Sequence, residues 1–140
     1  MAPTVHATAV ALRRKGAWQG VLIRGASGAG KSDLALRLID QGARLIADDR
    51  VHLWASGQTL YARPPATIAG LIEVRGLGIT KVPVLDLCAV RLVVDLIDHT
   101  PERLPDPAFE SLCDIRLPLH LLNPRPASAA AVVARAIEAL

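Results

Sequence analysis

The feature that most constrains this chain is the stretch Gly25-Ala-Ser-Gly-Ala-Gly-Lys-Ser32, which matches the phosphate-binding pattern G-x-x-x-x-G-K-[ST] at every fixed position. In such a loop the glycines let backbone N–H groups turn inward around phosphates, while the lysine reaches the outer phosphates and the last hydroxyl ligates Mg²⁺. We therefore predict that the whole loop binds the phosphates of a nucleotide, through Gly25, Ala26, Ser27, Gly28, Ala29, Gly30, Lys31 and Ser32.

The segments around this loop predict alternating strands and helices. Residues 18–24 form a short apolar run rich in strand formers, as expected of a buried strand. After the loop, apolar residues recur at helical spacing, and Gly42 follows where a helix-ending glycine is common, so we predict a helix over 31–41. A second apolar strand, 43–47, then ends on two aspartates.

The length of 140 residues predicts one domain, residues 1–140, with a real core but no room for a separate substrate domain. A closing helix is expected within 127–140, where apolar residues again recur at helical spacing. The predicted fold class is α/β: a phosphate loop at the mouth of a mixed β-sheet with flanking helices.

Composition limits the classes of partner. The net charge is +3, the basic residues are scattered, and their only run, Arg13-Arg14-Lys15, lacks interleaved aromatics. We expect no nucleic-acid partner, because aromatic residues make up only 3% of the chain. No apolar stretch approaches membrane-spanning length, and no secretory leader is recognisable, so we expect a cytoplasmic protein without a membrane partner. Cys88 and Cys113 lack metal-type spacing and are expected to be buried free thiols.

Phosphoryl transfer needs a carboxylate beyond the loop, and two places supply one. Asp95 ends the apolar run 90–95, as the carboxylate of a generic phosphate-loop kinase or NTPase would. Asp48 and Asp49 instead end the strand that follows the loop's helix. Two adjacent carboxylates can take different roles, one near the metal and one as acceptor of a hydroxyl proton, because their like charges push their pKa values apart. A polar turn after the strand explains that pair equally well from the residues alone.

Three segments carry a family resemblance. Arg44-Leu-Ile-Ala-Asp-Asp49, Leu71-Ile-Glu-Val-Arg-Gly-Leu-Gly-Ile79 and a loop of the form G-x-S-G-x-G-K-S occur in this order. Together they resemble the HPr kinase/phosphorylase family over about residues 4–105, in its short form consisting of the catalytic core. The resemblance implies the fold of an HPr kinase/PEP carboxykinase-like core.

The resemblance also implies roles for the acidic residues. Asp49 resembles the family's proton acceptor when a protein serine is phosphorylated. Glu73 and Ser32 are expected to ligate Mg²⁺, and Asp48 is expected to help hold the metal. On sequence alone, Glu73 would fit one face of a salt-bridged strand just as well.

Basic residues complete the implied catalytic set. Lys31 is expected at the outer phosphates, and Arg75 and Arg103 match arginines that the family uses in catalysis. His6 matches the histidine on the strand before the loop. From the residues alone, His6 fits a hydrogen-bonded strand histidine equally well, and Arg103 fits a solvated loop residue.

The activity implied by the resemblance is ATP-dependent, Mg²⁺-dependent phosphorylation of a serine on an HPr-type phosphocarrier of the bacterial phosphotransferase system. The resemblance also implies dephosphorylation of the carrier by phosphorolysis, which would use inorganic phosphate and release pyrophosphate. The family forms hexamers, so a homo-oligomer is expected. Two other interpretations stay open: a generic small-molecule kinase or NTPase that uses Asp95, and a nucleotide-sensing module that binds ATP and transfers nothing.

Overall fold

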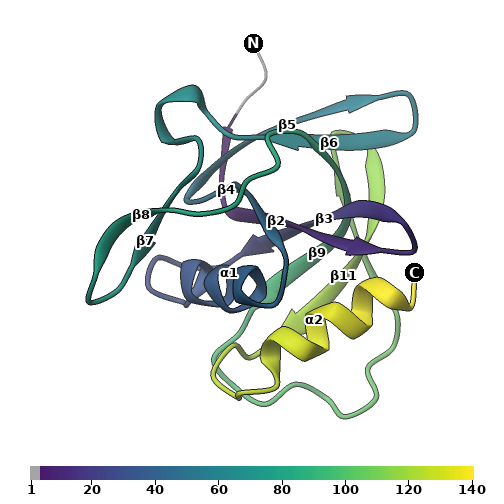
Figure 1. Cartoon of the computed structure of the whole chain (residues 1–140). Coiled ribbons are helices and arrows are strands. Elements are labelled where there is room, and N and C mark those ends of the chain that lie inside the picture. Colours follow the sequence, from purple (N-terminus) through teal and green to yellow (C-terminus); the bar gives the residue numbers. More distant parts are fainter. Residues whose placement is uncertain (1–3) are drawn as a thin grey trace.

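The computed structural model describes residues 4–140 (Figure 1). Its helices are α1 (Lys31–Asp40), α2 (Ala129–Glu138) and the short 3₁₀ turn η1 (Ala66–Ile68). Its strands are β1 (Thr4–His6), β2 (Thr8–Arg14), β3 (Ala17–Arg24), β4 (Arg44–Ala47), β5 (Arg50–Ser56), β6 (Thr59–Arg63), β7 (Leu71–Val74), β8 (Gly78–Lys81), β9 (Cys88–Leu96), β10 (Ala108–Leu112) and β11 (Ile115–Leu122).

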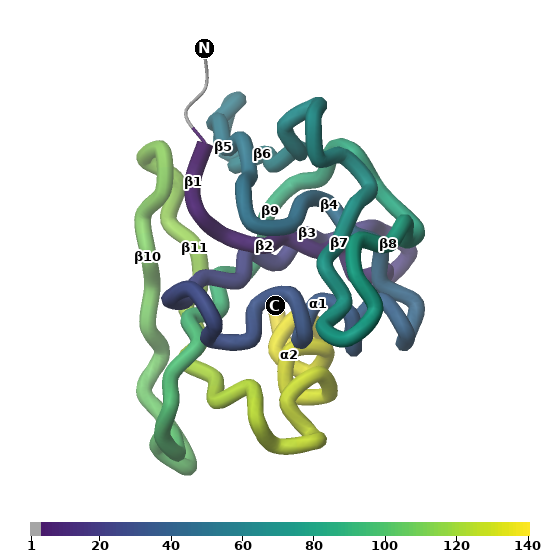
Figure 2. Tube along the Cα trace, turned by 90° about the vertical axis from the view of Figure 1, so that its left-hand side faces the viewer, coloured from purple at the N-terminus to yellow at the C-terminus, as the bar shows by residue number. Residues whose placement is uncertain are grey.

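One large mixed sheet organises the fold. Its strands run in the order β1-β5-β6-β9-β3-β2-β4, and the β10–β11 hairpin joins through β11, which pairs with β9. β9 is parallel to both β3 and β11, whereas the other pairings in this sheet are antiparallel. β7 and β8 form a separate hairpin, which lies beside α1 in both views of the chain (Figures 1 and 2). The predicted α/β class with a mixed sheet is confirmed.

Both helices pack on one face of the sheet. Leu34 and Leu38 of α1 and Val133 and Ile137 of α2 are buried against strand residues such as Ile23. Burying each side chain of this size contributes about 1.5–3 kcal/mol relative to leaving it exposed. A second core lies on the other face, between the central strands and the β5–β6 hairpin. The sheet therefore lies between two apolar cores, which hold its strands in place.

The predicted elements around the phosphate-loop motif are present with small shifts of their ends. The expected strand 18–24 is β3, the expected helix 31–41 is α1, and the expected strand 43–47 is β4. Gly42 follows α1 with φ = 102°, a conformation that a side chain would disfavour, which explains why the helix stops there. The expected C-terminal helix is α2.

One prediction about the cysteines is wrong. Cys113 is exposed, because it lies in the turn between β10 and β11, where its φ is 50°. Cys88 is buried as expected, and this burial raises the pKa of its thiol to about 11. Both are free thiols. Within residues 4–140, no helix is long and apolar enough to span a membrane.

Candidate active site

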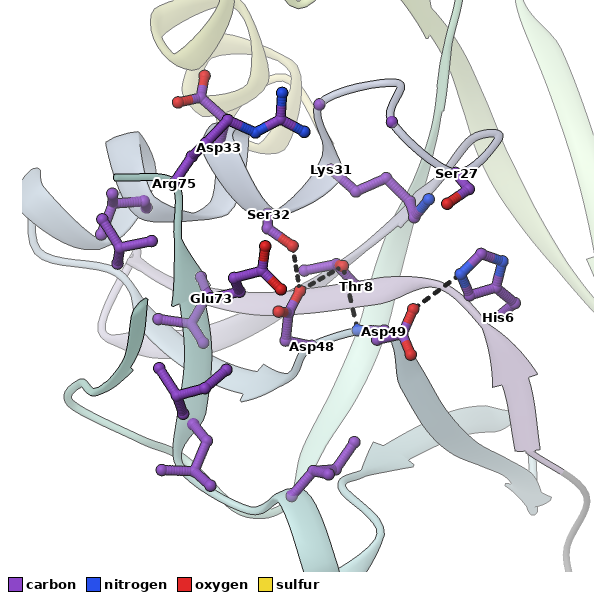
Figure 3. A pocket seen from close by; sticks show the side chains of 18 residues that line it. His6, Thr8, Ser27, Lys31, Ser32, Asp33, Asp48, Asp49, Glu73 and Arg75 are labelled. Atoms are coloured by element: carbon purple, nitrogen blue, oxygen red, sulfur yellow. Dashed lines mark hydrogen bonds and ion pairs between the residues drawn. The ribbon is translucent and has the colours of Figure 1, made fainter. Parts of the chain in front are cut away.

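A cavity of about 760 Å³ opens between the phosphate-loop motif, the ends of β1 and β4, and the β7–β8 hairpin (Figure 3). Ten of the residues predicted from the sequence line it: His6, Ser27, Gly28, Gly30, Lys31, Ser32, Asp48, Asp49, Glu73 and Arg75. The structure therefore brings segments from four separate parts of the chain to one place. Gly25, Ala26 and Ala29 belong to the same loop but are not among the lining residues.

The loop has the backbone needed to hold an anion. Gly28 and Gly30 have φ values of 81° and 103°, which turn the chain back into the start of α1. The ammonium of Lys31 is folded inside this curve, where it donates to the carbonyls of Gly25 (2.8 Å) and Ala26 (3.1 Å). The positive dipole end of α1 lies at this loop, and such a helix end favours anions such as phosphate groups.

Asp48 lies below the loop and is buried. Its Oδ1 accepts a hydrogen bond from the Ser32 hydroxyl (2.6 Å) and another from the Thr8 hydroxyl (2.9 Å). Asp48 is thus joined directly to the hydroxyl that the motif assigns to Mg²⁺. Thr8 lines the same cavity, but it was not predicted as a site residue from the sequence. The one hint in the sequence is that Thr8 follows His6 by two residues, a spacing that places both side chains on the same side of an extended chain.

Asp49 lies at the mouth of the cavity in an unusual backbone conformation. Its φ is 71°, the left-handed region that costs a non-glycine residue about 1 kcal/mol or more. Its Oδ1 is 2.8 Å from Nε2 of His6, and the side chains of both residues are well exposed. His6 is therefore hydrogen-bonded, as the simpler interpretation of it required, and the partner is the carboxylate implied as proton acceptor.

The β7–β8 hairpin supplies the opposite wall. Ile72 is buried and anchors β7 beside α1, while Glu73 and Arg75 are exposed and line the cavity. Glu73 belongs to β7 and Arg75 to the turn that follows it, and Figure 3 shows the Glu73 carboxylate directed toward the side on which Ser32 and Asp48 lie. The three glycines of this segment, Gly70, Gly76 and Gly78, all have positive φ, so the backbone bends sharply at these points.

Asp95, the competing carboxylate, has other partners. The Arg24 guanidinium donates to both of its oxygens (2.7 and 2.9 Å) and to Glu110 Oε2 (2.6 Å). The carboxylates of Asp95 and Glu110 raise the pKa of Arg24 above its ordinary value, and the hydrogen bond to Asp95 is the main cause. Asp95 is not one of the residues that line the cavity. Within residues 4–140, the acidic side chains that do line it are Asp33 of α1, Asp48 and Asp49 after β4, and Glu73 of β7.

The family follows from a comparison with known sequences. Residues 1–124 match the HPr Serine kinase C-terminal domain. The chain belongs to this family. Among its relatives, the HPr kinase/phosphorylase of Lactiplantibacillus plantarum is 44% identical over 99 residues, which cover 66% of this chain and 31% of that protein. The HPr kinase/phosphorylase of Aromatoleum aromaticum is 43% identical over 105 residues, covering 72% of this chain and 32% of that protein.

A solved structure agrees with this membership. The Hpr(Ser) kinase/phosphatase from Coxiella burnetii superposes with a TM-score of 0.81 at 27% identity, covering 98% of this chain and 95% of that one. The chain spans about a third of the length of the two relatives above. The HPr kinase fold expected from the resemblance is therefore confirmed over nearly the whole chain.

One residue implied for this family domain lies apart from the others. Arg103 is exposed in the segment between β9 and β10 and is not among the residues that line the cavity. Its catalytic role stays a prediction.

The oxygen donors in the cavity fit a magnesium ion. No cluster of three or more His, Cys, Asp and Glu side chains able to hold a metal by itself occurs in residues 4–140. Mg²⁺ commonly takes only one or two carboxylates and completes its shell with water and substrate phosphates. The Ser32 hydroxyl with the carboxylates of Asp48 and Glu73 provides such an incomplete set beside the phosphate loop.

Proposed function

We propose that this chain is the catalytic domain of an ATP-dependent protein kinase that phosphorylates a serine on an HPr-type phosphocarrier. One observation carries the proposal: the exposed Asp49 carboxylate, held by His6, lines the same cavity as the phosphate loop. An attacking hydroxyl at the mouth would therefore meet its proton acceptor and the terminal phosphate together. The names of the relatives support the choice of substrate.

The nucleotide would be held by backbone N–H groups of the loop, by Lys31 and by Ser32. Asp48 fixes the Ser32 hydroxyl and, together with Glu73, would hold Mg²⁺. Bound there, the ion would neutralise the charge of the β- and γ-phosphates. The ammonium of Lys31 would exchange the carbonyls that it contacts now for phosphate oxygens.

In the transfer step, the serine oxygen would attack the γ-phosphorus of ATP while the bond to the β–γ bridging oxygen breaks and ADP leaves. Asp49 would take the hydroxyl proton, as a general base. Lys31 and Arg75 would stabilise the negative charge that spreads over the moving phosphoryl group. Each of these side chains lines the same cavity.

The same geometry would also serve dephosphorylation by phosphorolysis. Inorganic phosphate would attack the phosphorus of the phosphoserine, the bond from that phosphorus to the serine oxygen would break, and Asp49 would give a proton to the serine oxygen, with pyrophosphate as the other product. We extend the proposal to a cytoplasmic homo-oligomer, a hexamer by family resemblance, formed by a single domain that spans residues 1–140.

The test is a transfer assay with γ-labelled ATP, Mg²⁺ and an HPr-type phosphocarrier. The expected product is labelled phosphoserine on the carrier, absent when the acceptor serine of the carrier is changed to alanine. Tight ATP binding without labelled carrier would instead support a nucleotide sensor. Label that appears only in free phosphate or in a small molecule would support a generic phosphate-loop enzyme.

A further inference from the structure

The segment His6-Ala7-Thr8, where β1 passes into β2, contacts both residues of the Asp48–Asp49 pair. His6 holds the Asp49 side chain, and the backbone N–H of Ala7 donates to the Asp49 carbonyl (3.2 Å). Thr8 completes the set from a fully buried position. Within residues 4–140, Thr8, Lys31 and Asp48 are the three buried polar or charged side chains, and all of them line the cavity.

The Thr8 hydroxyl bridges the two aspartates. It donates its proton to Asp48 Oδ1 at 2.9 Å, and its oxygen accepts the backbone N–H of Asp49 at 3.4 Å (Figure 3). A hydroxyl has one proton and two lone pairs, so both contacts are made by the same group without competition. One oxygen thus fixes a carboxylate and, one residue later, the backbone that carries the next carboxylate.

The first contact sets the orientation of Asp48. Thr8 of β2 and Ser32 of α1 both donate to Oδ1, and these two contacts restrict the rotation of the carboxylate. Among the described residues, the side-chain hydrogen bonds of Asp48 both fall on Oδ1, which leaves its second oxygen for a cation. Without Thr8, the Ser32 contact alone would leave the carboxylate free to rotate.

The second contact supports a strained corner. Asp49 is in the left-handed region, and such a conformation persists only where its surroundings hold it. The corner is held by the Thr8 oxygen, the N–H of Ala7 and a turn contact from the Arg50 N–H to the Asp48 carbonyl (2.8 Å). The direction of the Asp49 side chain depends on this backbone.

We propose that Thr8 is a positioning residue for phosphoryl transfer: its hydroxyl orients Asp48 toward Ser32 and the metal and holds the Asp49 corner. The proposal rests on the proposed function, since it assigns Thr8 a part in the same reaction. Thr8 touches neither nucleotide nor acceptor in this account. If the role of Thr8 were purely structural, its hydrogen bonds would stabilise the fold and would not affect phosphoryl transfer.

The experiment compares Thr8→Val with Thr8→Ser in the full chain. Valine keeps the shape and removes the hydroxyl, whereas serine keeps the hydroxyl and removes a methyl group. We expect Thr8→Val to lower kcat by roughly 10- to 100-fold and to raise the Mg²⁺ concentration needed for half-maximal activity. Thr8→Ser should stay within about threefold of the wild type in both, since the hydrogen bonds persist. Thr59→Val, a strand threonine outside the cavity, is the matched control and should match the wild type.

Binding of a fluorescent ATP analogue, with and without Mg²⁺, separates this proposal from the proposed function. If the wild type transfers nothing to a carrier, the proposed function fails, while a Thr8→Val protein that loses the Mg²⁺-dependent part of binding still supports the role of Thr8. Wild-type kcat and Mg²⁺ dependence in Thr8→Val would overturn it. So would a Thr8→Ser protein as impaired as Thr8→Val, because packing rather than the hydroxyl would then be responsible.

Discussion

Asp95 at the end of β9 and the Asp48–Asp49 pair at the end of β4 occupy equivalent places at strand ends but have different neighbours. Asp95 faces Arg24 directly across the parallel β3–β9 ladder, so its charge is matched by a guanidinium on both oxygens. Asp48 and Asp49 follow β4, which is antiparallel to β2. Asp48 meets the hydroxyls of Thr8 and Ser32, and Asp49 meets the imidazole of His6. The difference shows that the partner decides what a strand-end carboxylate can do.

A guanidinium that donates to both oxygens leaves a carboxylate little capacity for a metal or a proton. Hydroxyl partners orient a carboxylate without neutralising it, so its charge stays available for a cation. The exposed contact between His6 and Asp49 leaves the latter open to an incoming group at the cavity mouth. The pair at β4 therefore keeps the capacity to hold a cation or to take a proton, whereas the charge of Asp95 is matched by Arg24.

The largest effect is expected for Asp49→Asn, which keeps the shape but removes the proton acceptor. Transfer to the carrier should fall by about 100- to 10,000-fold, the usual contribution of a general base. Affinity for a fluorescent ATP analogue should be unchanged, because the loop and Lys31 are untouched. Transfer is measured as the initial rate of phosphoserine formation, and affinity is measured by titration with the ATP analogue. An Asp49→Asn protein with a normal transfer rate would show that Asp49 is not the proton acceptor.

A smaller but still large effect is expected for Asp48→Asn. The amide can still accept the Ser32 hydrogen bond but loses the negative charge beside the metal. We expect kcat to fall by roughly 100-fold and the Mg²⁺ requirement to rise. Activity measured across a Mg²⁺ titration checks this, and a loss that is the same at every Mg²⁺ concentration would contradict the assignment to the metal.

Asp95→Asn should change stability more than activity. It weakens the partly buried ion pair with Arg24, and we expect a loss of about 1 kcal/mol in the free energy of unfolding. Transfer should stay within about tenfold of the wild type. Urea unfolding followed by fluorescence gives the stability, and the transfer assay gives the activity; a loss of transfer as large as that of Asp49→Asn would reverse the comparison.

Glu110→Gln should have the smallest effect, since it alters one contact of Arg24 and leaves the two contacts with Asp95 in place. Transfer is expected to match the wild type, and thermal unfolding is expected to shift less than for Asp95→Asn. Differential scanning calorimetry of the two variants side by side provides the comparison. A larger shift for Glu110→Gln than for Asp95→Asn would mean that Glu110, and not Asp95, is the main partner of Arg24.

The elements around the loop could be predicted because their signals are local. Apolar periodicity marks α1, and Gly42 marks its end, within a short stretch of chain. Contacts set by strand pairing had no such signal. Thr8 and Asp48 are 40 residues apart, and Arg24 and Asp95 are 71 apart, so their meeting depends on sheet order and register. Cys113 was predicted to be buried because cysteine usually is, but it lies in a turn that exposes it to solvent.

The choice of Asp48, Asp49 and Glu73 as the acidic site residues came from the family resemblance, whereas composition and spacing left Asp95 and the β4 pair as alternatives. The structure separates them through Arg24, whose guanidinium is committed to Asp95.

The most direct test of the central claim is the ratio of transfer rates between two variants, Asp95→Asn and Asp49→Asn. Both change one strand-end carboxylate to an amide, and both are assayed with γ-labelled ATP and the same HPr-type phosphocarrier. We predict that the Asp95→Asn protein is at least about tenfold more active than the Asp49→Asn protein. An inactive Asp95→Asn protein beside a fully active Asp49→Asn protein would contradict the account.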